Sequence, residues 1–311
     1  MKNSRRRFIG QATLAVAGIA FLPETFSCAP RLSTPPAGEV MGLQLYSVRD
    51  EMRANPLDTL KAVSNMGYRF VEHAGYNNRK FYGWGAAEFK KVLADLGMQM
   101  RTGHTVLGRN HWDNSKNDFT DLWKYTVEDA AIVGQEIVIS PSMDNEYRKT
   151  LDGLKRFMEI FNKSGELCRK SGMKFGYHNH DFEFSEKLEG VTLFDHILNL
   201  TDPDLVTQQL DIGNMYHAGG IAKDIVNKYP RRFESMHVKD EILAPGGGEM
   251  GGNYESCVLG TGIIPVKEVM DLGRQIGGTK HYIVEQESYQ NRKPLDAMKL
   301  NFDQMKKWGY A

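Results

Sequence analysis

The sequence predicts an α/β protein folded as a single-domain (β/α)8 TIM barrel. Short apolar runs rich in β-forming residues alternate eight times with longer segments of helical periodicity. The 311 residues suffice, because about 250 residues make one such barrel. The first strand runs into residues 46–49 (YSVR), without the glycine-rich turn that the main alternative, a doubly wound open sheet, would place there.

Each predicted strand is a short run of aliphatic, aromatic or β-branched residues with polar residues at its end. The predicted strands cover residues 41–48, 70–73, 98–105, 136–140, 174–178, 207–212, 234–238 and 282–287.

The segments between the strands have the spacing of amphipathic helices, and several end in a glycine that can adopt the positive φ of a helix terminus. These glycines are Gly67, Gly97, Gly172 and Gly277. The predicted helices cover residues 56–66, 86–96, 119–133, 150–171, 191–200, 221–228, 265–276 and 294–308.

The N-terminal region has the features of an export signal rather than of the barrel. Residues 4–9 (SRRRFI) form a twin-arginine pattern, and a short apolar run covers residues 12–22. We therefore predict a twin-arginine signal peptide over 1–30, a linker over 31–39, the barrel over 40–311, and a periplasmic location. An ordinary secretion signal, an uncleaved anchor and a lipid anchor at Cys28 are the alternatives, although Cys28 lacks the leucine expected three residues before it.

The charge balance argues against nucleic acid as a partner. The chain has 39 basic and 39 acidic residues, and residues 1–30 contain four of the basic and one of the acidic ones. The remainder therefore has 35 basic and 38 acidic side chains, whereas nucleic-acid binding usually needs a basic excess. We expect a small-molecule sugar or glycoside as partner and no membrane contact beyond the signal or a lipid anchor; a homodimer is compatible with the sequence.

Polar residues gather where the predicted strands end, which is where barrel enzymes place their chemistry. Five of the nine histidines stand at these ends, together with carboxylates from other strands. Uncompensated burial of such groups in one small volume is costly, and a divalent cation is the usual solution. The polar strand-end residues are Gln44, Tyr46, Arg49, Glu72, His73, His104, His178, His180, Asp211, Asn214, His237, Lys239, Glu285 and Glu287.

At these residues the chain resembles the sugar phosphate isomerase/epimerase family of xylose-isomerase-like TIM barrels, in the superfamily of AP endonuclease family 2. The similarity covers nearly all of residues 40–310. Its motifs are residues 42–50 (GLQLYSVRD), 71–76 (VEHAGY), 177–184 (YHNHDFEF), 211–214 (DIGN), 237–240 (HVKD), 259–262 (LGTG) and 284–287 (VEQE).

The resemblance implies one divalent metal ion held by four ligands. Asp211, His237 and Glu285 match the family's positions after strands six, seven and eight. The family's glutamate after strand five is replaced here by His178, and Asn214 replaces a histidine that epimerases often have. Mixed histidine and carboxylate ligands favour Mn²⁺, with Zn²⁺, Co²⁺ or Fe²⁺ as alternatives.

The resemblance also implies carbohydrate isomerase or epimerase activity, by proton abstraction next to a carbonyl. Glu285, His180 and Lys239 are the predicted catalytic residues, and His180 is the base if His178 binds the metal. A 3-keto-glycoside lyase or hydratase using β-elimination is the alternative, because His178 replaces one carboxylate of the usual pair. The predicted substrate-binding residues are Gln44, Tyr46, Arg49, Glu72, His104, Asn214 and Glu287.

Two further functions are compatible with a barrel of this type. An AP-endonuclease-type nuclease would need more metal ligands and a basic surface. A non-catalytic sugar-binding barrel would tolerate Glu285→Gln without loss of function.

Overall fold

The computed structural model describes residues 39–249 and 252–311. The predicted signal peptide, Cys28 and all but the last residue of the predicted linker lie outside the described residues. None of the described helices is both long and apolar enough to cross a bilayer.

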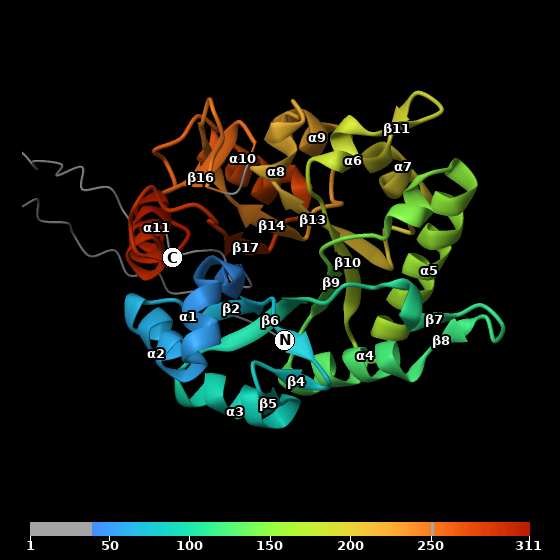
Figure 1. Ribbon diagram of the computed structural model, residues 1–311, viewed down its shortest axis with the longest axis horizontal. Coiled ribbons are helices and arrows are strands. Elements are labelled where there is room, and N and C mark those ends of the chain that lie inside the picture. Colours follow the sequence, from blue (N-terminus) through green and yellow to red (C-terminus); the bar gives the residue numbers. More distant parts are fainter. Residues whose placement is uncertain (1–38, 250–251) are drawn as a thin grey trace, which may run out of the picture. The chain divides into compact units, whose positions relative to one another are not determined.

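The described chain forms a closed barrel of eight parallel strands, which confirms the predicted fold. The strands follow one another around the barrel in chain order, and β1 closes it by pairing with both β17 and β2. Helices surround the strands (Figure 1). The barrel strands are β1 (Val40–Gln44), β2 (Phe70–His73), β6 (Gln99–His104), β9 (Ile137–Ser140), β10 (Lys174–His178), β13 (Val206–Asp211), β14 (Ser235–Val238) and β17 (His281–Val284).

Each barrel strand is followed by helical structure before the next one begins. The α-helices are α1 (Arg49–Ala54), α2 (Pro56–Met66), α3 (Ala86–Asp95), α4 (Asp121–Val133), α5 (Leu151–Arg169), α6 (Phe182–Ser185), α7 (Leu193–Leu200), α8 (Asn214–His217), α9 (Ala222–Lys228), α10 (Val266–Leu272) and α11 (Pro294–Trp308). Short tighter or wider helical turns are η1 (Leu45–Val48), η2 (Arg109–His111), η3 (Asn145–Arg148) and η4 (Gly273–Gly277).

Small antiparallel sheets interrupt four of the connections that leave the carboxyl ends of barrel strands. They enlarge this face of the barrel, where a site would lie. Their strands are β3 (Tyr76–Asn77), β4 (Lys80–Phe81), β5 (Trp84–Gly85), β7 (Trp112–Asp113), β8 (Asp118–Phe119), β11 (Lys187–Leu188), β12 (Val191–Thr192), β15 (Asp240–Leu243) and β16 (Tyr254–Cys257).

The largest differences from the predicted elements are at the first and last strands. The strand predicted over 41–48 ends at Gln44, because the Gln44 side chain accepts a hydrogen bond from the Tyr46 amide (3.1 Å) and η1 begins. The strand predicted over 282–287 ends at Val284, so Glu285 and Glu287 lie in the following loop. The helix predicted over 265–276 is α-helical only to Leu272 and continues as the π-helical turn η4.

Apolar packing between the strands and the surrounding helices holds the barrel in shape. Phe161 on α5 packs edge-on to Phe175 of β10, with ring centroids 4.9 Å apart, and both side chains are fully buried. The indole of Trp123 on α4 donates a hydrogen bond to Ser164 on α5 (2.9 Å), which satisfies its polar atom in the core. This rigid shell positions the strand ends that carry the polar residues.

Candidate functional site

Four strands bring potential metal ligands to one point at the carboxyl end of the barrel. Asp211 ends β13, His237 lies on β14, and Glu285 directly follows β17; one ligand atom from each lies within 4.8 Å of the others. His178 ends β10, and its Nε2 lies 3.9 Å from Asp211 Oδ2. All four side chains are buried, so their positions are set by the packing of the barrel.

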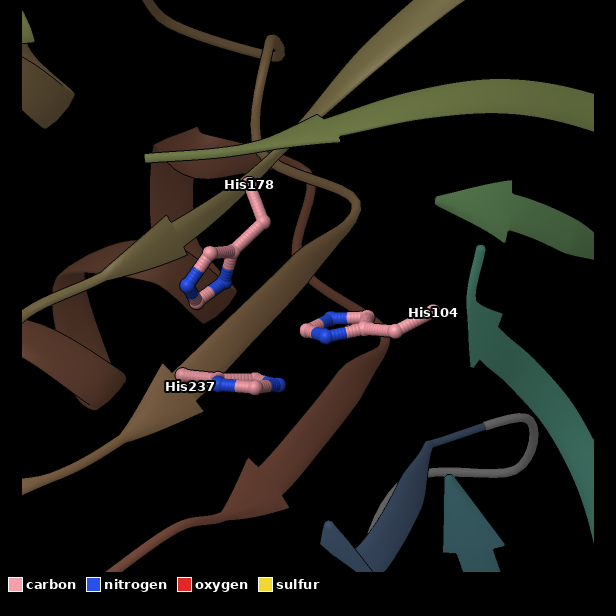
Figure 2. Close-up of side chains that lie close together, drawn as sticks. All are labelled: His104, His178 and His237. Carbon is pink, nitrogen blue, oxygen red and sulfur yellow. The ribbon is translucent and has the colours of Figure 1, made fainter. Parts of the chain in front are cut away.

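Three imidazole rings meet at this point from strands that are distant in the sequence. Figure 2 shows His104 from β6, His178 from β10 and His237 from β14 gathered together. Their ring centroids lie 4.6 to 5.1 Å apart. These three side chains form a second group with metal-ligand spacing, which shares His237 with the first.

The hydrogen bonds of His237 orient one of its nitrogens toward the carboxylates of the first group. Its Nε2 lies 2.6 Å from Oε1 of Glu72, and a carboxylate only accepts, so Nε2 carries the hydrogen. Its Nδ1 faces Glu285 Oε2 at 3.0 Å and Asp211 Oδ2 at 3.8 Å. A carboxylate behind a histidine in this way is typical of metal sites, because it fixes the tautomer that binds the ion.

The side-chain amide of Gln209 orients His178 in a similar way. The Gln209 amide donates from Nε2 to Glu72 (2.9 Å) and Ser235 (2.9 Å), which assigns its Oε1 as the atom 3.1 Å from His178 Nδ1. Nδ1 therefore donates, and the lone pair is on Nε2, the nitrogen that faces Asp211. Gln209 lies two residues before Asp211 on β13, so both point to the same side of the strand.

Asp211 has one oxygen engaged and one available to a cation. Oδ1 accepts hydrogen bonds from the amides of Gly213 (2.9 Å) and Asn214 (2.7 Å). Oδ2 is buried and makes no hydrogen bond within residues 39–249 and 252–311, although Lys239 Nζ lies 3.0 Å away as an ion pair. Two imidazole nitrogens and two carboxylates thus converge, and this donor set fits a divalent ion of the Mn²⁺, Fe²⁺, Co²⁺ or Zn²⁺ kind.

Lys239 supplies a positive charge beside this donor set. Its Nζ lies 2.8 Å from Glu285 Oε2 and donates to Glu287 (2.8 Å) and Asn214 (3.1 Å). A Cβ at Gly213 would lie 2.6 Å from the Lys239 side chain, so only glycine leaves room for it. Burial would lower the pKa of Lys239, but the surrounding carboxylates raise it well above its usual range.

The carboxylates and imidazoles of the site shift one another's ionisation. Burial would raise the pKa of Glu285, but Lys239 and His237 hold it well below its usual value. Burial would lower the pKa of His237, yet Glu285 and Glu72 raise it to about 10, so a cation that binds here would displace the hydrogen that Nδ1 shares with Glu285. The pKa of His178 is lowered by burial and then by His237 and His104, so His178 is neutral and able to bind a metal.

Glu72 is the central acceptor behind the site, and its removal should weaken metal binding. Its carboxylate accepts from Gln44 (2.8 Å) and Gln209, and contacts His104 (3.1 Å) and His237. We expect Glu72→Gln to lower metal affinity by about 10- to 100-fold, because the amide no longer fixes the His237 tautomer. Titration calorimetry with Mn²⁺ measures this, with Glu136→Gln at the other end of the barrel as control; equal affinities would contradict this role.

A cavity of about 700 Å³ opens above these residues. Of the predicted ligands and catalytic residues, His178, His180 and Glu285 line it, and so do the predicted substrate-binding residues Tyr46, His104, Asn214 and Glu287. Asp211, His237 and Lys239 do not line it, nor do the predicted substrate-binding residues Gln44, Arg49 and Glu72. Gln44 and Glu72 are fully buried, and Arg49 binds the Tyr289 hydroxyl (3.1 Å) and the Glu287 carbonyl.

His180 has a ring nitrogen without a hydrogen-bond partner in the described part of the chain. It lines the cavity, and its Nδ1 is buried and makes no hydrogen bond to the described chain. Burial lowers the pKa of His180, which keeps it neutral. The backbone is held by Glu183, whose Oε2 accepts from the His180 amide (2.8 Å) while Oε1 accepts from the Tyr177 hydroxyl. His180 is therefore positioned and able to accept a proton.

Glu183 should make the stability of the barrel depend on pH. Burial raises its pKa to about 7 in the folded protein, whereas the usual value is about 4.3. The folded state then holds a proton that the unfolded state has lost, so the free energy of unfolding falls as pH rises from about 4.3 to 7, by about 4 kcal/mol. Urea unfolding at several pH values should show this loss in the natural protein and not in Glu183→Gln; equal slopes would contradict it.

Sequence reasoning assigned no role to Gln209, Glu183 or Tyr177, which position His178 and His180. Gln209 carried a signal, because a polar residue two places before Asp211 on a buried strand faces the same side. No sequence pattern pointed to Glu183 or Tyr177, because their hydrogen bond forms only when the short helix α6 turns back over β10.

With this geometry in place, comparison with known proteins identifies the family. Residues 60–308 match the family of xylose isomerase-like TIM barrels. The chain belongs to that family. This confirms the resemblance drawn from the strand-end motifs.

Individual relatives are more distant. An inosose dehydratase of Clostridium perfringens is 32% identical over 101 residues, 32% of this chain and 33% of that protein, so the chain spans about a third of that relative's length. A sugar phosphate isomerase/epimerase from Parabacteroides distasonis has a TM-score of 0.74 at 24% identity, covering 88% of this chain and 96% of that one. An IOLI protein with a bound zinc atom has a TM-score of 0.67 at 12% identity, covering 86% and 97%. The two structural likenesses bear on the fold alone.

Proposed function

We propose that this family member is a metal-dependent lyase that acts on a ketone form of a sugar or cyclic polyol. It would remove the proton next to the carbonyl and release the oxygen substituent of the adjacent carbon. The inosose dehydratase relative supports elimination as the reaction type. The sequence favoured isomerisation or epimerisation first, and the arrangement of His178 and His180 is the reason to prefer elimination.

The unpartnered Nδ1 of His180, beside a metal-facing His178, carries this proposal. Epimerisation with two bases needs a proton acceptor on each side of the reacting carbon. The position of the family's first carboxylate holds His178, whose lone pair faces Asp211. His180 lines the cavity, and its buried Nδ1 makes no hydrogen bond within the described chain; a single base is sufficient for elimination.

The proposed reaction balances without an external reagent. His180 accepts the proton from the carbon next to the carbonyl, and the electron pair of that C–H bond forms a C=C bond. The C–O bond on the neighbouring carbon breaks, and its oxygen takes the proton back from His180 and leaves as water or an alcohol. The unsaturated ketone remains in the cavity.

The predicted ligands His178, Asp211, His237 and Glu285 would hold the metal ion, with Mn²⁺ as our first choice and Zn²⁺, Co²⁺ or Fe²⁺ as alternatives. When bound, the ion supplies a Lewis acid that stabilises negative charge on the substrate oxygen. Lys239 contributes a fixed positive charge behind Glu285 and Glu287. Tyr46, Asn214 and Glu287 line the cavity and offer hydrogen bonds to hydroxyl groups.

The test is to incubate the metal-loaded protein in D₂O with an inosose, a 3-keto-glucoside, and ordinary aldoses and ketoses. If the reaction is elimination, water or the aglycone is released and a new conjugated ketone forms. Ultraviolet absorbance detects the ketone, and mass spectrometry identifies both products. Deuterium on an intact sugar would instead establish isomerase or epimerase activity. No turnover of any ketone, with the metal bound, would overturn the proposal.

We also propose that the protein acts in the periplasm after twin-arginine export. The pattern at residues 4–9 supports this. A folded reporter fused behind residues 1–39 should reach the periplasm, and replacing Arg5, Arg6 and Arg7 by lysine should keep it in the cytoplasm. Export of both fusions would argue for a different signal.

A further inference from the structure

The cavity extends well beyond the candidate metal ligands. Its inner end is lined by His104, His178, His180 and Glu285, and its outer end by side chains from the segments that follow β2 and β6. About 700 Å³ is in the range that holds a drug-sized ligand, and a single sugar ring fills only part of it. The outer end therefore has room for a second part of the ligand.

The outer end exposes large apolar side chains that the barrel core does not use. Val106 is 45% exposed, Leu122 55% and Tyr125 41%, and all three line this cavity. Val106 lies in the loop after β6, while Leu122 and Tyr125 lie on α4. Exposed apolar groups that converge on one cavity from separate segments are typical of a ligand site.

The charges at the outer end favour an uncharged ligand. Within the described chain, Arg79 is the one lysine or arginine that lines this cavity. Its guanidinium is bound to Asp129 (2.7 and 3.0 Å) and Glu128 (2.6 Å) and lies 4.2 Å from the centre of the Tyr125 ring. These two carboxylates already neutralise the Arg79 cation, and Glu285 and Glu287 add negative charge to the cavity wall. The cavity therefore does not favour a phosphate.

We propose that the substrate is an uncharged, two-part molecule. Its hydroxylated ring lies at the inner end, and a flat apolar or aromatic group, joined through the departing oxygen, lies against Val106, Leu122 and Tyr125. This rests on the proposed function, because the outer group is the alcohol that elimination releases. The substrate class is then an aryl-type glycoside carrying a ketone on its ring, rather than a free sugar or a sugar phosphate.

The test measures binding of unreactive probes that lack the ketone. 4-Nitrophenyl β-glucoside should bind the metal-loaded full chain about tenfold more tightly than methyl β-glucoside, which corresponds to about 1.4 kcal/mol. Leu122→Ala and Tyr125→Ala should each reduce this preference by at least about threefold. Ile132→Ala is the matched control, because Ile132 lies on the same helix and is also 41% exposed, and it should leave the preference unchanged. Adding a 6-phosphate to the aryl glucoside should not tighten binding.

The outcomes separate this inference from the proposed function. Equal affinity for the aryl and methyl glucosides, or tighter binding of the phosphate form, would overturn the two-part substrate even if ketones are eliminated. A preference for the aryl glucoside that depends on Leu122 and Tyr125 would support it, even if no ketone reacts and the lyase proposal fails. Normal thermal unfolding of both variants confirms that they fold.

Discussion

Glu285→Gln is expected to release the bound metal and to lower kcat/KM by about 10³-fold, which corresponds to about 4 kcal/mol. Glu285 Oε2 lies 3.0 Å from His237 Nδ1 and belongs to the ligand group with Asp211 and His237. A neutral amide at this position removes a negative charge from a buried site that must balance a divalent cation. Elemental analysis of the purified variant, together with kinetics on the keto substrate, measures both effects.

Glu287→Gln is the matched control for this prediction. Glu287 also contacts Lys239 at 2.8 Å but lies outside the ligand group. The control should keep the metal, so a loss in both variants would point to general damage. Full activity and full metal content in Glu285→Gln would contradict the prediction. Sugar binding that is unchanged in Glu285→Gln, without turnover by either protein, would instead support a non-catalytic sugar-binding barrel.

His180→Ala should lower kcat by about 10²- to 10⁴-fold, the usual effect of removing a general base. The imidazole lines the cavity, and its unpartnered Nδ1 is the proposed proton acceptor. The metal should stay bound, because His180 is outside both groups with metal-ligand spacing. Loss of the hydrogen next to the carbonyl and release of the product should slow together, since both depend on the same proton transfer.

Two histidine variants serve as comparisons. His178→Ala should lose the metal as well as activity, since His178 Nε2 faces Asp211. His196→Ala should change neither, because His196 lies on α7, with its ring against the Leu188 carbonyl. A fully active His180→Ala variant would show that another group removes the proton.

The fold could be read from the sequence because its periodic pattern is strong. The helices over 56–66 and 294–308 have the predicted bounds, and every predicted barrel strand overlaps an observed one. The ends of the first and last strands could not be predicted. They depend on the Gln44 side chain capping η1 and on the chain turning after Val284, which periodicity does not encode.

The meeting of Asp211, His237 and Glu285 could be expected in advance, because a closed barrel aims all its strand ends at one axis. How deep each polar side chain lies in the barrel could not be predicted. Gln44 and Glu72 were predicted to touch substrate and are buried behind the ligands, while His104, also on a strand end, reaches the cavity. Strand alternation gives the side of a strand on which a residue lies, but the packing of neighbouring side chains sets its height in the barrel.

The sequence by itself therefore determined the barrel, its family and the meeting of Asp211, His237 and Glu285, since these follow from periodicity and strand-end chemistry. Only the tertiary structure decided which nitrogen of each histidine faces Asp211, because that depends on Glu72 and Gln209 arriving from other strands. It also decided that Lys239 pairs with Glu285 and Glu287, and that the cavity continues to Tyr125. Such contacts join residues far apart in the chain, and their geometry exists only once the barrel has closed.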